Sequence, residues 1–179
     1  MNYKRVFIDK AYVFITIVTA KRRKILIKNI DILRDSFRLT IERFNYKIHA
    51  ICILPDHIHM VIEPYDITDY PKIIQQLKRY FSQKVDRTLI ESYSLSESKI
   101  KRNECDIWQH RYWEHTITNL EDLYRHIDYI HYNPIKHNYV DIIKDWKYSS
   151  FNKFVKQNYY NENWANANDK YKINDLDFE

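Results

Sequence analysis

The chain has 179 residues, 45% of them apolar, which suits one domain with a substantial core. No apolar run approaches the roughly 20 residues of a transmembrane helix, and no signal-peptide pattern opens the sequence, so we expect a cytoplasmic protein. Glycine is absent, which excludes a P-loop and the glycine fingerprint of dinucleotide-binding folds. The two cysteines, Cys52 and Cys105, give neither a disulfide framework nor a Cys-x-x-Cys pair.

The charge of the chain is unevenly distributed. The formal net charge is +5, but residues 161–179 carry five acidic and two basic side chains, which leaves +8 on residues 1–160. A basic body favours a polyanionic partner, and nucleic acid is the first candidate. An ordinary basic protein without such a partner remains the alternative.

Hydrophobic periodicity predicts four strands and three long helices. Asn29, Asp69 and Asn119 stand where helix N-caps are expected, and Pro55-Asp56 is a turn that would pair the second and third strands as a hairpin. Residues 91–107 lack periodic apolar side chains and are typical of a connector. The expected strands cover residues 11–19, 46–54, 57–63 and 111–117, and the expected helices cover residues 30–44, 70–89 and 120–132.

This order of elements predicts an α+β fold. Strand, helix, strand, strand, helix, strand is a split β-α-β arrangement, which forms an antiparallel sheet covered by helices, and here an extra C-terminal helix follows. We expect one domain over residues 1–152 and a weakly ordered tail over residues 153–179.

The third expected strand carries two histidines, His57 and His59, two positions apart. Successive side chains on a strand alternate between faces, so both imidazoles point the same way, while Ile58, Met60 and Ile62 point toward a core. Two parallel imidazoles on a rigid strand form half of a divalent metal site. The alternative is a pair of histidines on a solvated strand face.

The helix expected over residues 120–132 carries a second group of polar residues. Its apolar positions span about 80° of one face, and Tyr129 lies about 140° from the centre of that face. We therefore do not interpret Tyr129 as a core residue, and a surface aromatic is the alternative. Arg125, Tyr129 and Asn133 are spaced by four and form one ridge. Asn133 precedes Pro134, which favours a helix end there, and Asn138 can adopt the left-handed conformation after it.

Facing each other, these two groups could act on a phosphodiester. A divalent ion on His57, His59 and the Asn133 carboxamide oxygen would stabilise charge in the transition state. The Tyr129 hydroxyl could attack phosphorus and become covalently linked.

The motifs resemble those of the HUH single-tyrosine transposases, in particular the branch called REP-associated tyrosine transposases. Residues 55–59 (Pro-Asp-His-Ile-His) are similar to the His-hydrophobic-His motif, and the similarity covers roughly residues 5–152. The branch is further indicated by Trp-Gln at 108–109, Tyr-Trp-Glu at 112–114, His-Ile-Asp-Tyr-Ile-His-Tyr-Asn-Pro-Ile-Lys-His at 126–137 and Asp-Trp-Lys-Tyr-Ser-Ser at 145–150.

The resemblance implies a ferredoxin-like fold and an enzyme that cuts and rejoins single-stranded DNA near a hairpin. Tyr129 would be the nucleophile that forms a 5′-phosphotyrosine, and His57, His59 and Asn133 would hold Mg²⁺ or Mn²⁺. We expect a prokaryotic, nucleoid-associated protein, with a monomer slightly favoured over a homodimer. The candidate phosphate contacts are Lys21, Arg22, Arg23, Lys78, Arg79 and Arg125.

Two other functions are compatible with parts of the pattern. A protein with the same fold could bind hairpin nucleic acid without cutting it, although such a protein does not need His57, His59 and Tyr129. A zinc hydrolase would need a third strong ligand, and Glu63 is about 13 Å along the strand from His59, which makes it a poor partner.

Overall fold

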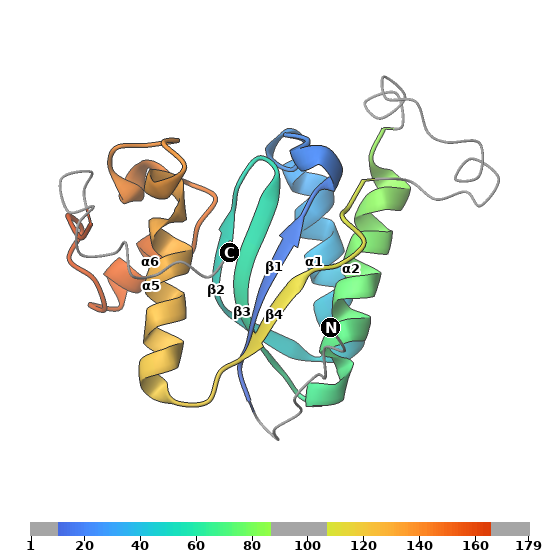
Figure 1. Ribbon diagram of the computed structural model, residues 1–179, viewed down its shortest axis with the longest axis horizontal. Coiled ribbons are helices and arrows are strands. Elements are labelled where there is room, and N and C mark those ends of the chain that lie inside the picture. The colour runs from blue at the N-terminus through green and yellow to red at the C-terminus, as the bar shows by residue number, and fades with distance from the viewer. Residues whose placement is uncertain (1–10, 87–106, 166–179) are drawn as a thin grey trace.

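The computed structural model describes residues 11–86 and 107–165. Four strands form one antiparallel sheet in the order β2-β3-β1-β4, as expected for the ferredoxin-like α+β fold (Figure 1). The two central strands, β3 and β1, are therefore paired on both sides. The strands are β1 (Val13–Val18), β2 (Tyr46–Ile53), β3 (His57–Pro64) and β4 (Trp113–Thr116).

Helices cover both faces of the sheet (Figure 1). Helices α1 (Ile30–Phe44) and α2 (Tyr70–Lys84) pack side by side on one face. Helix α5 (Leu120–Lys136) lies against β2 and β3 on the other face, and the short α6 (Phe151–Lys156) follows it. The 3-10 turns are η1 (Ala20–Arg22), η2 (Ile27–Asn29), η3 (Ile67–Asp69) and η4 (Ile143–Asp145).

Alternation along β1 and β3 divides the core into two layers. Ile58, Met60 and Ile62 join the apolar cluster under α1 and α2, as predicted. Phe14 and Val61, on the opposite face, join the cluster under α5. Full burial of each such side chain contributes about 1.5–3 kcal/mol to folding stability, so the packing of both helical layers stabilises the sheet. His57 and His59 share the face of Val61 and therefore face α5.

Turns that commonly use glycine are made here by other residues. Asn45 ends α1 with φ = 47°, and Asn138 has φ = 55° just after α5, as the sequence predicted. Asparagine tolerates this left-handed region better than most residues. Lys21 and Arg22 also have positive φ, at 56° and 48°, in the turn after β1.

Of the three expected caps, only Asn119 caps its helix through its side chain, accepting a hydrogen bond from the Asp122 amide at 2.8 Å. Asn29 and Asp69 make no such bond, because η2 and η3 lead directly into α1 and α2. The cap position therefore moves upstream. Before α2 it is Asp66, which accepts from the Thr68 amide.

The chain beyond α5 packs against the sheet and that helix. The Ile53 amide donates to the Tyr148 carbonyl and the Ser150 amide donates to the Ile51 carbonyl, so this segment covers the outer edge of β2. The domain boundary expected at residue 152 falls inside α6, and Tyr160 and Ala165 belong to the buried cluster under α5. The rest of the expected tail, and nearly all of the expected connector at 91–107, lie outside the described residues. Within the described ranges, every helix is too short or too polar to cross a membrane.

Candidate active site

His57 and His59 lie at the start of β3 with their side chains almost fully buried, at 1% and 0% exposure. Their rings are 4.8 Å apart and nearly perpendicular, and both face the α5 side of the sheet. The alternative of a solvated pair of histidines is therefore excluded. Alternation along the strand placed them there, as the sequence predicted.

Each imidazole is oriented by a hydrogen bond through Nδ1. His57 Nδ1 is 2.7 Å from Asp56 Oδ1, and His59 Nδ1 is 2.8 Å from Thr16 Oγ1 on β1. Such bonds fix the ring orientation and leave Nε2 as the metal-binding nitrogen, the usual design of histidine metal sites. Asp56 and Thr16 were not predicted as site residues. Asp56 is part of the Pro-Asp-His-Ile-His motif, whereas Thr16 is 43 residues away and carries no local signal.

The electrostatics of the site favour a neutral imidazole at His59 and an ionised carboxylate at Asp56. Burial lowers the pKa of His59 well below its usual value, and the nearby positive groups of Lys136 and Arg22 lower it further. Burial alone would raise the pKa of Asp56, but the hydrogen bond with His57 and the charge of Arg22 lower it overall. Arg22 Nη1 is 3.5 Å from Asp56 Oδ2. Neutral imidazole is the form that binds a metal.

Helix α5 brings Tyr129 against His59 and carries Asn133 one turn further along. The Tyr129 ring meets the His59 ring edge-on at 5.2 Å, and Asn133 follows one turn later with 0% exposure. Asn133 Nδ2 donates to the Tyr129 carbonyl at 2.8 Å, while its Oδ1 is buried and accepts no hydrogen bond from the described residues. A buried carboxamide oxygen without a donor is costly unless a cation or water meets it. Two oriented imidazoles and this oxygen fit a divalent ion.

Two expectations about α5 were wrong. The helix continues through Pro134 to Lys136, instead of ending at about residue 132. Tyr129 is 1% exposed, so it is buried and not a surface aromatic, while Leu120, counted in the apolar stripe, is 64% exposed. The helical wheel assumed one buried face, but the Tyr129 side of α5 also packs on the sheet, against Phe14 and His59, while Asp128 and His131 contact Tyr160 of the C-terminal segment.

Two further residues lie beside Tyr129 and His57. Lys136 Nζ lies 3.5 Å from the Tyr129 hydroxyl and 5.0 Å from the centre of its ring. The His137 ring is 4.8 Å from that of His57. Neither was predicted, although both belong to the Pro-Ile-Lys-His end of the motif. The spacing of seven residues between Tyr129 and Lys136, two helical turns, was the available signal.

The six candidate phosphate contacts occupy three separate elements. Lys21, Arg22, Arg79 and Arg125 are exposed. Arg23 is 8% exposed and donates through Nε to the Ala20 carbonyl. Lys78 donates to the Gln109 carbonyl, and burial lowers its pKa to about 8. Of the six, Arg22 comes closest to the site, through its ion pair with Asp56.

Comparison with known families identifies the class of protein. Residues 7–133 match the family described as transposase, IS200 like, which is well over half of the chain. The chain belongs to this family and is a transposase. The match includes His57, His59, Tyr129 and Asn133.

Individual relatives define the branch. A protein of Haemophilus influenzae assigned to the REP-associated tyrosine transposases is 40% identical over 166 residues, covering 92% of this chain and 93% of the relative. The REP-associated tyrosine transposase of Escherichia coli is 28% identical, covering 92% and 90%. A solved structure of a REP-associated tyrosine transposase bound to a REP hairpin has a TM-score of 0.75 at 27% identity, covering 92% and 91%. This chain is thus a member of the REP-associated tyrosine transposase branch. Membership of this transposase family implies that a divalent metal ion takes part.

Proposed function

We propose that the chain cuts and rejoins single-stranded DNA beside a hairpin, with Tyr129 as the nucleophile. The observation that carries the proposal is the contact between Tyr129 and His59, 5.2 Å between ring centres, with the buried Asn133 oxygen one turn away. A hairpin as the recognised structure is supported by the related transposase solved with a REP hairpin. A protein that only binds hairpins does not need this cluster of buried polar groups.

The proposed reaction is a balanced exchange of phosphate esters. The Tyr129 oxygen bonds to phosphorus, the bond from phosphorus to the 3′ oxygen breaks, and that oxygen takes up the proton that the phenol loses. The products are a 5′-phosphotyrosine and a free 3′-OH. A 3′-OH of another strand end can then attack the phosphotyrosine and restore the tyrosine, so one residue both cuts and rejoins.

The side chains around Tyr129 would divide the work. The Lys136 ammonium, 3.5 Å from the phenolic oxygen, stabilises negative charge there during attack and departure. His57, His59 and the Asn133 oxygen would hold Mg²⁺ or Mn²⁺, which neutralises charge on the phosphate. Asp56 and Thr16 keep the two imidazoles in position. Because Tyr129 is 1% exposed, the scissile phosphate reaches it only after neighbouring side chains move.

DNA binding would rest on the exposed basic residues. Arg22, beside Asp56, is suited to hold a phosphate near the cut, while Lys21, Arg79 and Arg125 can contact the strand further away. Arg23 and Lys78, which donate to backbone carbonyls, are weaker candidates. Since His59 and Tyr129 of one chain already touch, we propose that the site is complete within a monomer.

The test uses labelled DNA hairpins with flanking single strands from the neighbourhood of the gene. Incubation with Mn²⁺ should give a DNA-labelled protein band on a denaturing gel. The band should be absent with EDTA and in Tyr129→Phe, which should still shift the hairpin on a native gel. Loss of the band in His57→Ala would support the metal ligands. A native shift that survives EDTA, without any covalent band in the wild type, would favour a binding protein and contradict the proposal.

A further inference from the structure

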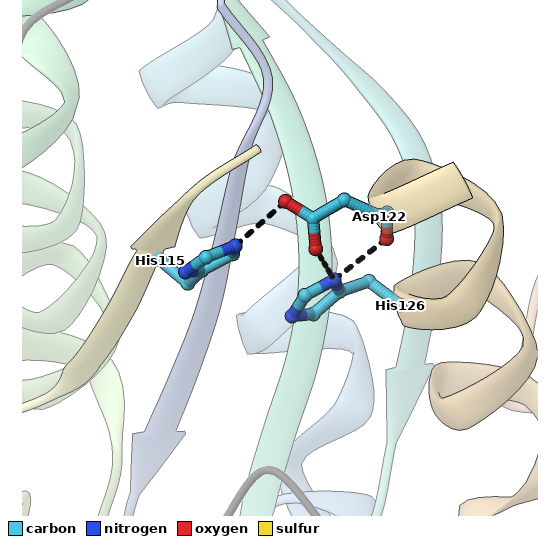
Figure 2. Close-up of side chains that lie close together, drawn as sticks. All are labelled: His115, Asp122 and His126. Carbon is cyan, nitrogen blue, oxygen red and sulfur yellow. Dashed lines mark hydrogen bonds and ion pairs between the residues drawn. The ribbon is translucent and has the colours of Figure 1, made fainter. Parts of the chain in front are cut away.

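A second group of metal-ligating side chains lies where β4 meets the first turns of α5. His115 projects from β4, and Asp122 and His126 project from α5 one turn apart (Figure 2). One ligand atom from each lies within 4.8 Å of the other two. Figure 2 shows the three side chains converging from the strand and the helix on a common centre.

Two distances within this group are shorter than those of a coordination sphere, and small side-chain movements would bring the three ligand atoms into one. His115 Nε2 is 2.8 Å from Asp122 Oδ2, and His126 Nδ1 is 3.0 Å from Asp122 Oδ1. Ligand atoms about 2.0–2.1 Å from a tetrahedral Zn²⁺ are about 3.3–3.5 Å from one another. To admit an ion, these two pairs would open by about half an ångström, and the widest separation in the group, up to 4.8 Å, would close by somewhat more than about 1 Å.

The two ligand nitrogens donate hydrogen bonds, His115 Nε2 to Asp122 Oδ2 and His126 Nδ1 to the Asp122 carbonyl, so an ion would displace a proton from each. Burial lowers the pKa of His126, although Asp122 acts in the opposite direction. Burial alone would raise the pKa of Asp122, but its hydrogen bonds with His115 and the Thr118 amide lower it overall. The lowered pKa values favour a neutral His126 and an ionised Asp122, and metal binding at His126 Nδ1 would move the remaining ring proton to Nε2.

The surroundings provide both support and access. Asp122 Oδ2 also accepts from the Thr118 amide at 3.1 Å, which anchors the carboxylate, and a carboxylate has about four acceptor positions, so this bond does not preclude a metal. His126 is 1% exposed, whereas Asp122 and His115 have 20% and 38% of their side chains exposed. An ion can enter from the His115 side, where water can complete its coordination.

This group is separate from the candidate active site. The Phe14 ring stands between them, 4.7 Å from the His126 ring and 6.0 Å from the His59 ring. His126 is also three residues before Tyr129 on the same helix. An ion at the second group would therefore link β4 to the helix that carries the proposed nucleophile.

We propose that His115, Asp122 and His126 form a second metal site that takes a first-row transition ion of the Zn²⁺ type. Two imidazoles, one carboxylate and an open position are a donor set suited to Zn²⁺ or Co²⁺. The bound ion links β4 to α5 through its ligands on both elements. The proposal does not depend on the proposed DNA cleavage, because it concerns metal binding alone.

The experiment measures Co²⁺ and Zn²⁺ binding to chelator-treated full-length protein, by visible absorption for Co²⁺ and by calorimetry for Zn²⁺. A His59→Gln background weakens binding at the candidate active site, so that the second site is observed by itself. We expect about one equivalent to bind in that background, and a rise in melting temperature on adding Zn²⁺. Adding His115→Gln should weaken the affinity by more than the 10–100-fold typical of losing a supporting residue.

His49→Gln is the matched control. His49 also pairs with a carboxylate, Glu63 at 2.8 Å, but the group of three does not include it, and its loss should leave binding unchanged. His115 is the residue to replace because it is the most exposed of the three, and equal melting temperatures in EDTA would verify its fold. If His115→Gln binds Co²⁺ as well as its parent does, or if the His59→Gln background binds none, the three side chains form only a hydrogen-bonded link and the proposal is wrong.

Discussion

The hydrogen bond from Thr16 to His59 gives the sharpest test of the candidate active site. Thr16→Val replaces the hydroxyl on β1 with a methyl group of similar size and removes the 2.8 Å bond to His59 Nδ1. Thr16 is 6% exposed, so water does not readily replace the lost partner. The His59 ring then loses its fixed orientation, while Tyr129, Asn133 and His57 keep their places.

The structure sets the size of the expected effect. A residue that orients a metal-binding histidine typically contributes 10–100-fold in metal affinity or activity, which corresponds to about 1.4–2.7 kcal/mol. Leaving a buried nitrogen without its partner costs about 1–3 kcal/mol of folding stability. A domain with about 5–15 kcal/mol of stability remains folded after that loss. We therefore expect a folded variant that needs about 10–100 times more Mn²⁺ for the same cleavage rate.

The assay is a titration of cleavage rate against Mn²⁺ concentration, with hairpin binding measured separately in EDTA. Thr116→Val, which removes a hydroxyl from β4 and leaves Thr16 in place, is the control and should behave as the wild type. Excess Mn²⁺ should restore most of the rate in Thr16→Val. A folded Thr16→Val variant with wild-type Mn²⁺ dependence would refute the assignment of His59 as an oriented metal ligand.

Three further predictions follow from other contacts. Lys136→Met should slow cleavage about 10–100-fold with hairpin binding nearly unchanged, because the charge beside the Tyr129 hydroxyl is lost; an equal rate would exclude a role for this lysine. A mixture of Tyr129→Phe and His57→Ala should stay inactive if each chain holds a whole site, whereas recovered cleavage would show a site shared between chains. Burial lowers the pKa of Lys78 to about 8 in the folded protein, against 10.5 in the unfolded chain. Between these two pH values the unfolded chain binds more protons than the folded protein, so the free energy of unfolding should rise with pH between about 8 and 10.5. Urea unfolding at pH 7 and pH 9 should show this rise in the wild type, by less than about 1.4 kcal/mol per unit because the side chain is partly exposed, and less of it in Lys78→Met.

The parts of the fold that depend on local pattern were predictable. The bounds of α1 and the hairpin of β2 and β3 follow from periodicity and from one turn, and both appear as predicted. His57 and His59 share one face because side chains two residues apart on a strand point the same way. This alternation is local to the strand and does not depend on distant parts of the chain. The left-handed conformation of Asn138 was predictable because the residue after a helix often adopts this conformation, and in a chain without glycine asparagine is the residue that tolerates it best.

The parts that depend on packing between distant segments were not predictable in this way. Thr16 meets His59 only because β1 pairs with β3 in a register that sets Thr16 opposite His59. The caps expected at Asn29 and Asp69 failed because a 3-10 turn precedes each helix, and a helical pattern does not reveal where the first turn begins. Asp122 and His126 have the four-residue spacing of a helix, but His115 comes from a strand, so no single period links all three.

Tyr129 shows how packing around a helix changes the chemistry open to it. It was singled out because it fell outside the apolar stripe of α5, yet it is buried, because its ring packs on the sheet against Phe14 of β1 and His59 of β3. This packing on the sheet keeps water from the Tyr129 ring. A charge in a water-poor site interacts more strongly than at a surface, so Lys136 and a divalent ion would act on the Tyr129 oxygen with less screening. Phe14, which carries no proposed catalytic group, would therefore contribute to the reactivity of Tyr129 by packing against its ring and excluding water.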